Sequence, residues 1–312
     1  MPPLHILVTG GTGFLGQALC RMLLEQGHSL TLWVRNMEKG RKMYGQVDGD
    51  RLHCITRLAE LQDTPVDAIL NFSGEPVLGP RWSPARQQVL HASRSGVTQA
   101  LVEWVAQLAH KPRWILSASA IGFYGVQDVD DPGALGENAP PQPIFMSELC
   151  QRWEHTAQGM AAYGVAVATV RLGVVLGPQG ALPQMLKPFR LGVGTQMGAG
   201  DQVLSWVHLD DVLAAVAFLL AKLDSAPATG AYNLTAPCPV TQKEFTRTAC
   251  KVLHRPLAVP VPAVVLQLLL GEQATLLTDG QRVVPQRLLA EGFRFRFDTF
   301  EAALRDLEQR RK

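Results

Sequence analysis

Residues 5–16, HILVTGGTGFLG, decide the fold of this chain. The run HILVT is typical of a buried strand, and the apolar residues that follow the glycines recur at helical spacing. Gly10, Gly13 and Gly16 stand between the two in the spacing GxxGxxG. Such a turn lets main chain approach a pyrophosphate, which a Cβ would obstruct, and the helix that follows offers free N–H groups to the phosphates. The alternative is an ordinary tight turn. We predict a dinucleotide-binding turn whose contacts come from Gly10, Thr12, Gly13, Phe14, Leu15 and Gly16.

Strand-like and helix-like patterns alternate beyond this turn. A long helix is expected from about Pro84 to Leu108, and the segment PIFMSELCQRWEHTA (143–157) predicts another. Further strands are predicted by the apolar runs SLTLWV (29–34), DAILNFSG (67–74), RWILSASA (113–120) and VAVATVRLGVVLG (165–177). Fully apolar strands that are joined by helices form a parallel sheet covered on both faces. The sequence therefore predicts an α/β fold with a Rossmann-type, doubly wound parallel sheet.

The alternation breaks after about Gly177. Residues 180–202 are rich in Gly and Pro with one short helix, residues 203–224 return to helix, and GAYNLTA (230–236) reads as one more strand. The rest is expected to be helical with Pro-rich joints. We expect residues 1–180 to form the nucleotide-binding domain, with 204–235 returning to it. Residues 181–203 and 236–312 would then form a smaller, discontinuous lobe on the substrate side.

The amino-acid composition limits the classes of function that the protein can have. Of 312 residues, 47% are hydrophobic and 18% charged, so the chain can bury a sizeable core. A formal net charge of +2 gives no general attraction to nucleic acid or to anionic membranes. Five cysteines without CxxC or Cys/His spacing argue against disulfides and against a metal site. No signal peptide precedes the first strand, and the apolar run VPAVVLQLLLG (261–271) is too short to span a bilayer. We expect a cytoplasmic protein with a small-molecule substrate.

The end of the second strand indicates which form of the cofactor binds. Proteins that bind NAD usually place an acid there to accept hydrogen bonds from the ribose 2′-OH, whereas a cation suits a 2′-phosphate. Arg35 occupies this place, and Glu38 follows as a displaced acid. We predict NADP rather than NAD, with a plain surface arginine as the alternative for Arg35.

Five stretches resemble the extended or atypical branch of the short-chain dehydrogenase/reductase superfamily, the branch of nucleotide-sugar epimerases and dehydratases. In the family's order, over about residues 4 to 250, they are TGGTGFLG, LNFSGEPV, SASAIGFYG, VRLGVVLGP and SWVHLDDV…GAYNLT. The tail GEQATLLTDGQRVVPQRLLAEGFRFRF resembles the C-terminal piece of a narrower group, the epimerase-family proteins of unestablished substrate. Superfamily members often dimerise through a four-helix contact, so the resemblance also suggests a homodimer.

The resemblance implies further cofactor contacts. Ser73 and Gly74 are expected close to a ribose, and the backbone of Val175 is expected to flank the nicotinamide. Arg94 would reach the cofactor from the next helix, although an arginine on such a helix is more often a salt-bridge partner. In the segment WVHLDDV, His208 and Asp210 are either ligands or, as we favour, the cap of the following helix.

The superfamily's proton donor is a Tyr, and a Lys four residues later lowers the pKa of that Tyr. Counting back from Glu154, the Tyr place falls on Met146 and the Lys place on Cys150. A thioether carries no proton, and a thiol offers no fixed positive charge. The resemblance therefore implies cofactor binding but puts the standard mechanism in doubt.

Replacements for the missing pair are available. Ser119 matches the family's catalytic Ser, with Ser117 as the adjacent alternative, and either could instead contact the cofactor alone. Tyr124, on the loop that faces substrate in the family, is the first choice as proton donor. Glu148, Cys150 and Tyr163 are the other candidates.

The predicted lobe carries four further cations that are candidate ligands. Lys187 and Arg190 lie near Gly-rich turns and would bind a diphosphate, or simply form an exposed basic helix. Arg282 and Arg287 lie in the tail.

The sequence is compatible with two functions. The first is an NADP-dependent oxidoreductase or epimerase acting on a small carbonyl or hydroxyl compound, with nucleotide sugars among the candidates. The second is a non-catalytic NADP-binding redox sensor or scaffold.

Overall fold

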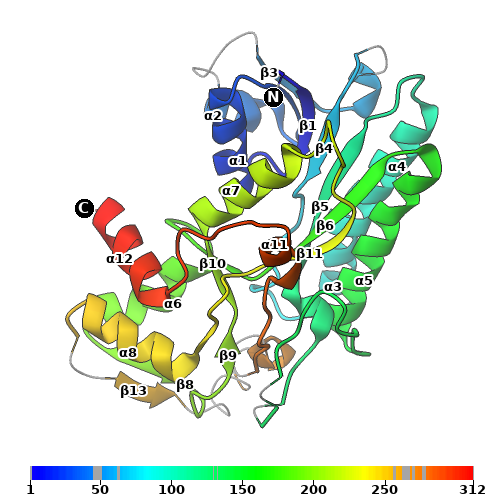
Figure 1. The fold of residues 1–312 in the computed structure, drawn as a ribbon. Helices are drawn as coiled ribbons and strands as arrows, with labels where there is room; N and C mark the ends of the chain where they lie inside the picture. Colours follow the sequence, from blue (N-terminus) through cyan, green and yellow to red (C-terminus); the bar gives the residue numbers. More distant parts are fainter. Residues whose placement is uncertain are drawn as a thin grey trace.

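The computed structural model describes residues 2–44, 51–61, 64–128, 130–131, 133–255, 258–261, 268, 271–275 and 279–311. Within them, seven parallel strands form the central sheet (Figure 1). In sheet order these are β11 (Gly230–Leu234), β6 (Ala166–Leu172), β5 (Trp114–Ala120), β4 (Ala68–Asn71), β1 (His5–Thr9), β2 (Ser29–Trp33) and β3 (Leu52–Ile55). The chain reverses its direction of travel across the sheet at β1, and ligands of such sheets bind outside the carboxyl ends of the strands at this point.

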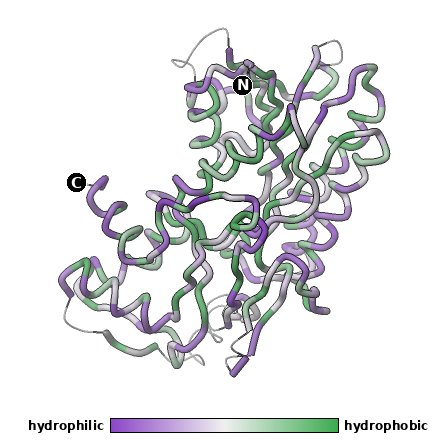
Figure 2. Tube along the Cα trace, in the orientation of Figure 1, coloured by the Kyte–Doolittle hydropathy of each residue, from purple (hydrophilic) through white to green (hydrophobic). Residues whose placement is uncertain are grey.

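Helices cover both faces of the sheet because its strands are apolar on both sides. Ile6 and Val8 of β1 pack in one core with α1 (Phe14–Glu25) and α7 (Leu209–Leu220). Leu7, between them in sequence, packs in a second core with α4 (Val97–Gln107) and α5 (Phe145–Gln158). In Figure 2 the strands of the central sheet are mostly hydrophobic, whereas the C-terminal helix is largely hydrophilic. The α/β prediction with a doubly wound parallel sheet is confirmed.

The predicted long helix is unbroken, but its middle turn is π-helical instead of α-helical. It consists of α3 (Pro84–His91), a π-helical turn (Ala92–Gly96) and α4. Ser83 caps α3, its side chain accepting from the N–H of Arg86. The π-helical turn directs Arg94 and Ser95 inward, where they are buried. Such turns are rare and occur frequently at functional sites.

The remaining elements lie mainly after the sixth strand of the chain. The smaller sheets pair β7 (Val174–Leu176) with β10 (Trp206–His208), β9 (Val203–Leu204) with β12 (Val240–Thr241), and β8 (Gly194–Met197) with β13 (Ala258–Val261). The helices are α2 (Met37–Tyr44), α6 (Ala181–Arg190), α8 (Gln242–Val252), α11 (Gln286–Ala290) and α12 (Phe300–Arg310). Short 3-10 turns are η1 (Leu58–Leu61), η3 (Ile121–Tyr124), η4 (Gly159–Tyr163) and η5 (Gly271–Ala274).

Two helical predictions are wrong in this part. Residues 203–208 form β9 and β10 instead of the start of a helix, and residues 258–261 form β13 within the tail that was expected to be helical. β9, β10 and β13 do not stand out as apolar runs of their own, and each exists because a distant strand pairs with it. Strand β3 and helix α2 were not predicted at all.

The C-terminal segment closes the open edge of the central sheet at β11. The side-chain amide of Asn233 donates to the carbonyl oxygen of Val284 at 3.0 Å, and Leu135 forms a bridge with Val283. Covering an edge strand in this way prevents it from pairing with another chain. Further along, Asp211 of α7 accepts hydrogen bonds from the backbone N–H groups of Arg296 and Phe297, which holds the tail against the first turn of α7.

No helix among the described residues is long and apolar enough to cross a membrane. The apolar run 261–271 lies largely outside the described residues, so the expectation about it stays a prediction.

Candidate functional site

The glycine turn lies at the carboxyl end of β1 and leaves no room for side chains. Gly10 has φ of 70°, and a Cβ there would lie 2.4 Å from the carbonyl oxygen of Phe72. A Cβ on Gly16 would lie 2.2 Å from the carbonyl oxygen of Gly10. Gly13 is the N-cap of α1, which has neither a capping side chain nor an acidic residue in its first turn. The backbone N–H groups of that turn therefore have no capping side chain. Free N–H groups at a helix N-terminus can bind an anion such as a dinucleotide phosphate.

Neighbouring side chains hold the turn in place. The hydroxyl of Tyr44, at the end of α2, donates to the carbonyl oxygen of Gly11 at 2.6 Å and is buried. The side-chain amide of Gln17 donates to the carbonyl oxygen of Thr12 at 3.3 Å. Phe14 lies against Gly177, where a Cβ would come 2.5 Å from the ring. Sequence reasoning missed Tyr44, whose only signal is an aromatic residue ending an otherwise charged helix.

Arg35 and the segment after β4 line the two sides of the turn. The side chain of Arg35 is 92% exposed, and its guanidinium lies 3.1 Å from a carboxylate oxygen of Glu75. Ser73 is half-buried, and Gly74 packs directly on Arg94, where a Cβ would lie 3.2 Å from the guanidinium carbon. Arg94 is buried and donates to the carbonyl oxygen of Glu75 at 2.9 Å. Arg94 therefore packs against Gly74 and holds the main chain of Glu75 through this hydrogen bond.

The two predicted catalytic hydroxyls belong to one buried network across β5, β6 and β11. Ser119 donates to Glu154 of α5 at 2.7 Å. Arg171 binds both oxygens of that carboxylate, at 2.9 and 2.8 Å, and donates to the hydroxyl of Tyr124 at 2.9 Å. Tyr124 in turn donates to the side-chain oxygen of Asn233 at 2.6 Å. An ion pair thus connects the two hydroxyls.

Burial decides the protonation state of these groups. Ser119 is 1% exposed and Tyr124 is 2% exposed. Burial raises the pKa of the Tyr124 phenol, and the nearby Arg171 guanidinium offsets this only in part. The phenol is therefore protonated at neutral pH, and both hydroxyls have their hydrogen bonds made within the protein.

Sequence comparison identifies the surrounding fold. The model of the NAD-dependent epimerase/dehydratase family matches residues 6–235. This chain belongs to the NAD-dependent epimerase/dehydratase family. A second model, a domain of unknown function called DUF1731, matches residues 261–307. The resemblance read from the five stretches and the tail is thereby confirmed.

Relatives extend over nearly the whole chain. "Epimerase family protein YfhF" of Bacillus subtilis is 33% identical over 99% of both chains. The crystal structure of human epimerase family protein SDR39U1 (isoform 2) with NADPH is 31% identical, with a TM-score of 0.85 over 98% of this chain and 99% of that one. A nucleoside-diphosphate sugar epimerase from Corynebacterium glutamicum is 26% identical, with a TM-score of 0.73 over 98% of this chain and 58% of that one.

Met146 and Cys150, which stand at the places predicted for the family's Tyr and Lys, are buried. Met146 is 9% exposed and packs with Leu90 and Leu149. Cys150 is 2% exposed, and burial raises the pKa of its thiol to about 11. The thiol is therefore protonated at neutral pH and behaves as a small hydrophobic group.

The other predicted residues occupy separate places. Ser117 is fully buried and accepts a hydrogen bond from the side-chain amide of Asn71 at 3.0 Å. Val175 is half-buried in β7, paired with β10. Glu148 is exposed, and Tyr163 lies in η4, beyond the opposite end of α5 from Met146.

The interpretation of His208 as a helix cap is confirmed. Its Nδ1 accepts from the backbone N–H of Asp210 at 3.0 Å, which caps α7. The ring is fully buried and stacks on Phe297, with 3.9 Å between the centroids. Burial lowers the pKa of His208, so the ring is neutral at physiological pH. Asp210 pairs with Arg310 of α12 at 2.6 Å.

Two of the four cations predicted as possible ligands in the lobe bind groups of the protein itself. Arg190 pairs with Glu308 of α12, and Arg287 lies 4.0 Å above the ring of Tyr232. Lys187 is exposed, and the backbone N–H of Arg282 donates to the side chain of Gln127 at 2.7 Å. Only Lys187 among these four side chains presents its charge at an exposed position, so a diphosphate site in the lobe stays a prediction.

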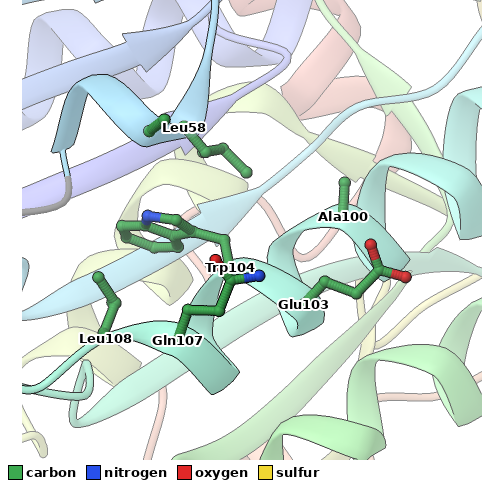
Figure 3. A pocket seen from close by; sticks show the side chains of 7 residues that line it. Leu58, Ala100, Glu103, Trp104, Gln107 and Leu108 are labelled. Atoms are coloured by element: carbon green, nitrogen blue, oxygen red, sulfur yellow. The ribbon is translucent and has the colours of Figure 1, made fainter.

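A hollow of about 210 Å³ lies elsewhere, between η1 and α4 (Figure 3). It is lined by Leu58, Ala59, Ala100, Glu103, Trp104, Gln107 and Leu108, none of which is a predicted site residue. In the part of the chain that the structure describes, no group of three or more His, Cys, Asp or Glu side chains could hold a metal ion.

Proposed function

We propose that the protein binds NADP(H) at the carboxyl ends of β1, β2 and β4. The observation that carries this proposal is the glycine turn, where Gly10 and Gly16 touch backbone so closely that only bare main chain fits. The uncapped first turn of α1 offers its N–H groups to the pyrophosphate. The relative crystallised with NADPH shares this fold over nearly its whole length.

Arg35 is the residue proposed to select NADP over NAD. It follows β2, and its exposed guanidinium, which pairs with Glu75 in this structure, would turn toward a 2′-phosphate beside the glycine turn. Guanidinium groups bind phosphate through two parallel hydrogen bonds, which makes such contacts strong. Asn36 caps the start of α2, its side-chain oxygen accepting from the N–H of Lys39 at 2.9 Å, so the main chain beside Arg35 is held.

The remaining cofactor contacts are proposed around this frame. Ser73 and Gly74 would meet a ribose with their main chain, while Arg94 holds that main chain in place. Val175 would flank the nicotinamide from β7. Ser117 would act indirectly, through its hydrogen bond with Asn71 at the end of β4.

We propose an oxidoreductase or epimerase-like activity on a small carbonyl or hydroxyl compound. When bound, NADP(H) supplies hydride transfer at its nicotinamide. In the oxidation direction, Ser119 would take the proton of the substrate hydroxyl and pass its own proton to Glu154, and reduction would reverse both transfers. Arg171 binds both oxygens of that carboxylate and also donates to the hydroxyl of Tyr124. The nucleoside-diphosphate sugar epimerase among the relatives makes nucleotide sugars the first substrates to test.

One observation favours a second function, a non-catalytic NADP(H)-binding redox sensor or scaffold. The Tyr and Lys places of the family hold Met146 and Cys150, and both predicted catalytic hydroxyls are enclosed. A proton donor must come within about 3 Å of the substrate oxygen, and neither hydroxyl is open to solvent in this structure.

Titration with NADPH and NADH, followed by NADPH consumption against sugar nucleotides, aldehydes and quinones, separates these functions. We expect Arg35→Ala to weaken NADPH binding by about 10- to 100-fold, the value of one or two charged hydrogen bonds, with little change for NADH. Equal affinities of the wild type for both nucleotides would refute the assignment of NADP. Binding without turnover across the whole panel would support the sensor, whereas turnover that is lost in Ser119→Ala would support the enzyme.

A further inference from the structure

Arg35 and Glu75 form an ion pair across the glycine turn. The guanidinium nitrogen and the carboxylate oxygen are 3.1 Å apart. Arg35 follows β2 and Glu75 follows β4, and β1, which ends at the turn, lies between these two strands. Neighbouring strands are about 4.8 Å apart, so the pair spans roughly 10 Å over the carboxyl end of β1. This is where the proposed cofactor must place the adenosine side of its pyrophosphate.

The main chain of Glu75 is held on both sides. Its N–H donates to the hydroxyl of Ser93 at 3.1 Å, and its carbonyl oxygen accepts from Arg94 at 2.9 Å. Ser93 and Arg94 belong to the π-helical turn, and Arg94 is 9% exposed. The side chain of Glu75 is 28% exposed, against 92% for Arg35. Glu75 is thus the anchored member of the pair, and Arg35 is the member that can turn away.

We infer that Glu75 competes with the 2′-phosphate of NADP(H) for Arg35 and so sets the preference between NADP(H) and NAD(H). This inference rests on the proposed cofactor binding. A 2′-phosphate carries a charge near −2 at neutral pH, so it must displace the carboxylate from Arg35 and then lie close to a like charge. A ribose 2′-OH makes no such demand, because a carboxylate accepts its hydrogen bond. The same pair therefore offers Arg35 to NADP(H) and Glu75 to NAD(H).

The expected change in nucleotide affinity is modest because the Arg35–Glu75 pair is exposed. An exposed ion pair changes an equilibrium constant by about 1.4- to fivefold, and removing the repulsion between carboxylate and phosphate contributes a similar factor. We therefore expect Glu75→Gln to tighten NADPH binding about three- to tenfold. NADH binding should weaken by about two- to threefold, because a neutral amide is the poorer partner for the ribose hydroxyl.

Glu38→Gln is the matched control. Glu38 lies in the first turn of α2, is exposed, and loses the same charge without being part of the pair. Titrations of wild type and both variants with NADPH and NADH, with thermal melts to verify folding, decide the inference. Opposite shifts for the two nucleotides in Glu75→Gln, with a smaller rise for NADPH in Glu38→Gln, support it. An unchanged NADPH affinity in Glu75→Gln, or an equal rise in both variants, overturns it.

A double variant tests the competition directly. Where Arg35→Ala has removed the shared partner, Glu75→Gln should tighten NADPH binding by a smaller factor than in the wild-type background, because only the repulsion between carboxylate and phosphate is left to remove. A gain as large as in the wild-type background would contradict competition for Arg35. Wild type that binds neither nucleotide would refute the proposed function itself, an outcome distinct from wild type that binds NADPH while Glu75→Gln gains nothing.

Discussion

Replacing Gly10 by alanine tests whether the glycine turn is a cofactor cradle. Two separate costs arise. Gly10 has φ of 70°, a conformation that costs an alanine about 1–2 kcal/mol. The added Cβ would also lie 2.4 Å from the carbonyl oxygen of Phe72, far inside ordinary van der Waals separations near 3.5 Å. Because that oxygen belongs to main chain, the turn has to move.

Gly27 provides the control that separates these costs. It lies just beyond α1, has φ of 89°, and a Cβ there would meet nothing within 4 Å. Gly27→Ala should therefore lose about 1–2 kcal/mol of stability and keep its affinity for NADPH. Gly10→Ala should lose more stability than this, because of the added clash, and should also misplace the N–H groups that face the phosphates. The loss of one charged hydrogen bond, about 1.5–3 kcal/mol, weakens NADPH binding by about 10- to 100-fold.

The assay is calorimetric titration of NADPH into each variant, with chemical denaturation to measure stability. Folded Gly10→Ala that binds NADPH within twofold of the wild type would refute the role of the turn. If Gly27→Ala loses as much affinity as Gly10→Ala, the effect reflects general destabilisation, and the geometric argument fails.

Three further predictions concern groups around the site. Tyr44→Phe removes the buried hydrogen bond to Gly11, so stability should fall by about 1–2 kcal/mol and NADPH should bind three- to tenfold more weakly in titration; unchanged affinity would exclude a positioning role. Arg171→Met leaves Glu154 without its cation, so urea denaturation should show a loss of about 2–4 kcal/mol, most of which returns when Glu154→Gln is added; no recovery would mean that the ion pair is not the cause. Burial lowers the pKa of His208 below its ordinary 6.5, so below about pH 6.5 the unfolded chain binds more protons than the folded one, and stability falls with pH. His208→Asn keeps an acceptor for the cap and should show a shallower fall of Tm between about pH 7 and 5, whereas an unchanged slope would assign that fall to other groups.

The fold was predictable because its signals are local. One short segment contains the strand that begins at His5, the glycines at 10, 13 and 16, and the helix that begins at Phe14. Each of these features can be recognised from its own residues. The other strands of the sheet except β3 are visible as apolar runs because both of their faces are buried. The short strands β9, β10 and β13 were missed because their pairing partners, not their own residues, create them.

The candidate site was predictable only in part. Ser119 and Tyr124 could be selected through the family resemblance, but the sequence held no sign that both hydroxyls would be enclosed. The partners that enclose them, Glu154, Arg171 and Asn233, come from α5, β6 and β11. None of these contacts follows from spacing along the chain, because the sheet order decides which side chains become neighbours.

By itself the sequence predicted a bare glycine turn between a strand and a helix, because Gly10, Gly13 and Gly16 stand in the spacing GxxGxxG between an apolar run and a helical pattern. It also placed Arg35 just after β2 and put Met146 and Cys150 at the predicted Tyr and Lys positions of α5. Only the tertiary structure decided that Glu75, 40 residues further along, would pair with Arg35. Backbone constraints act within a few residues and can be read locally, whereas charge pairing depends on which distant strand ends the folded sheet brings together.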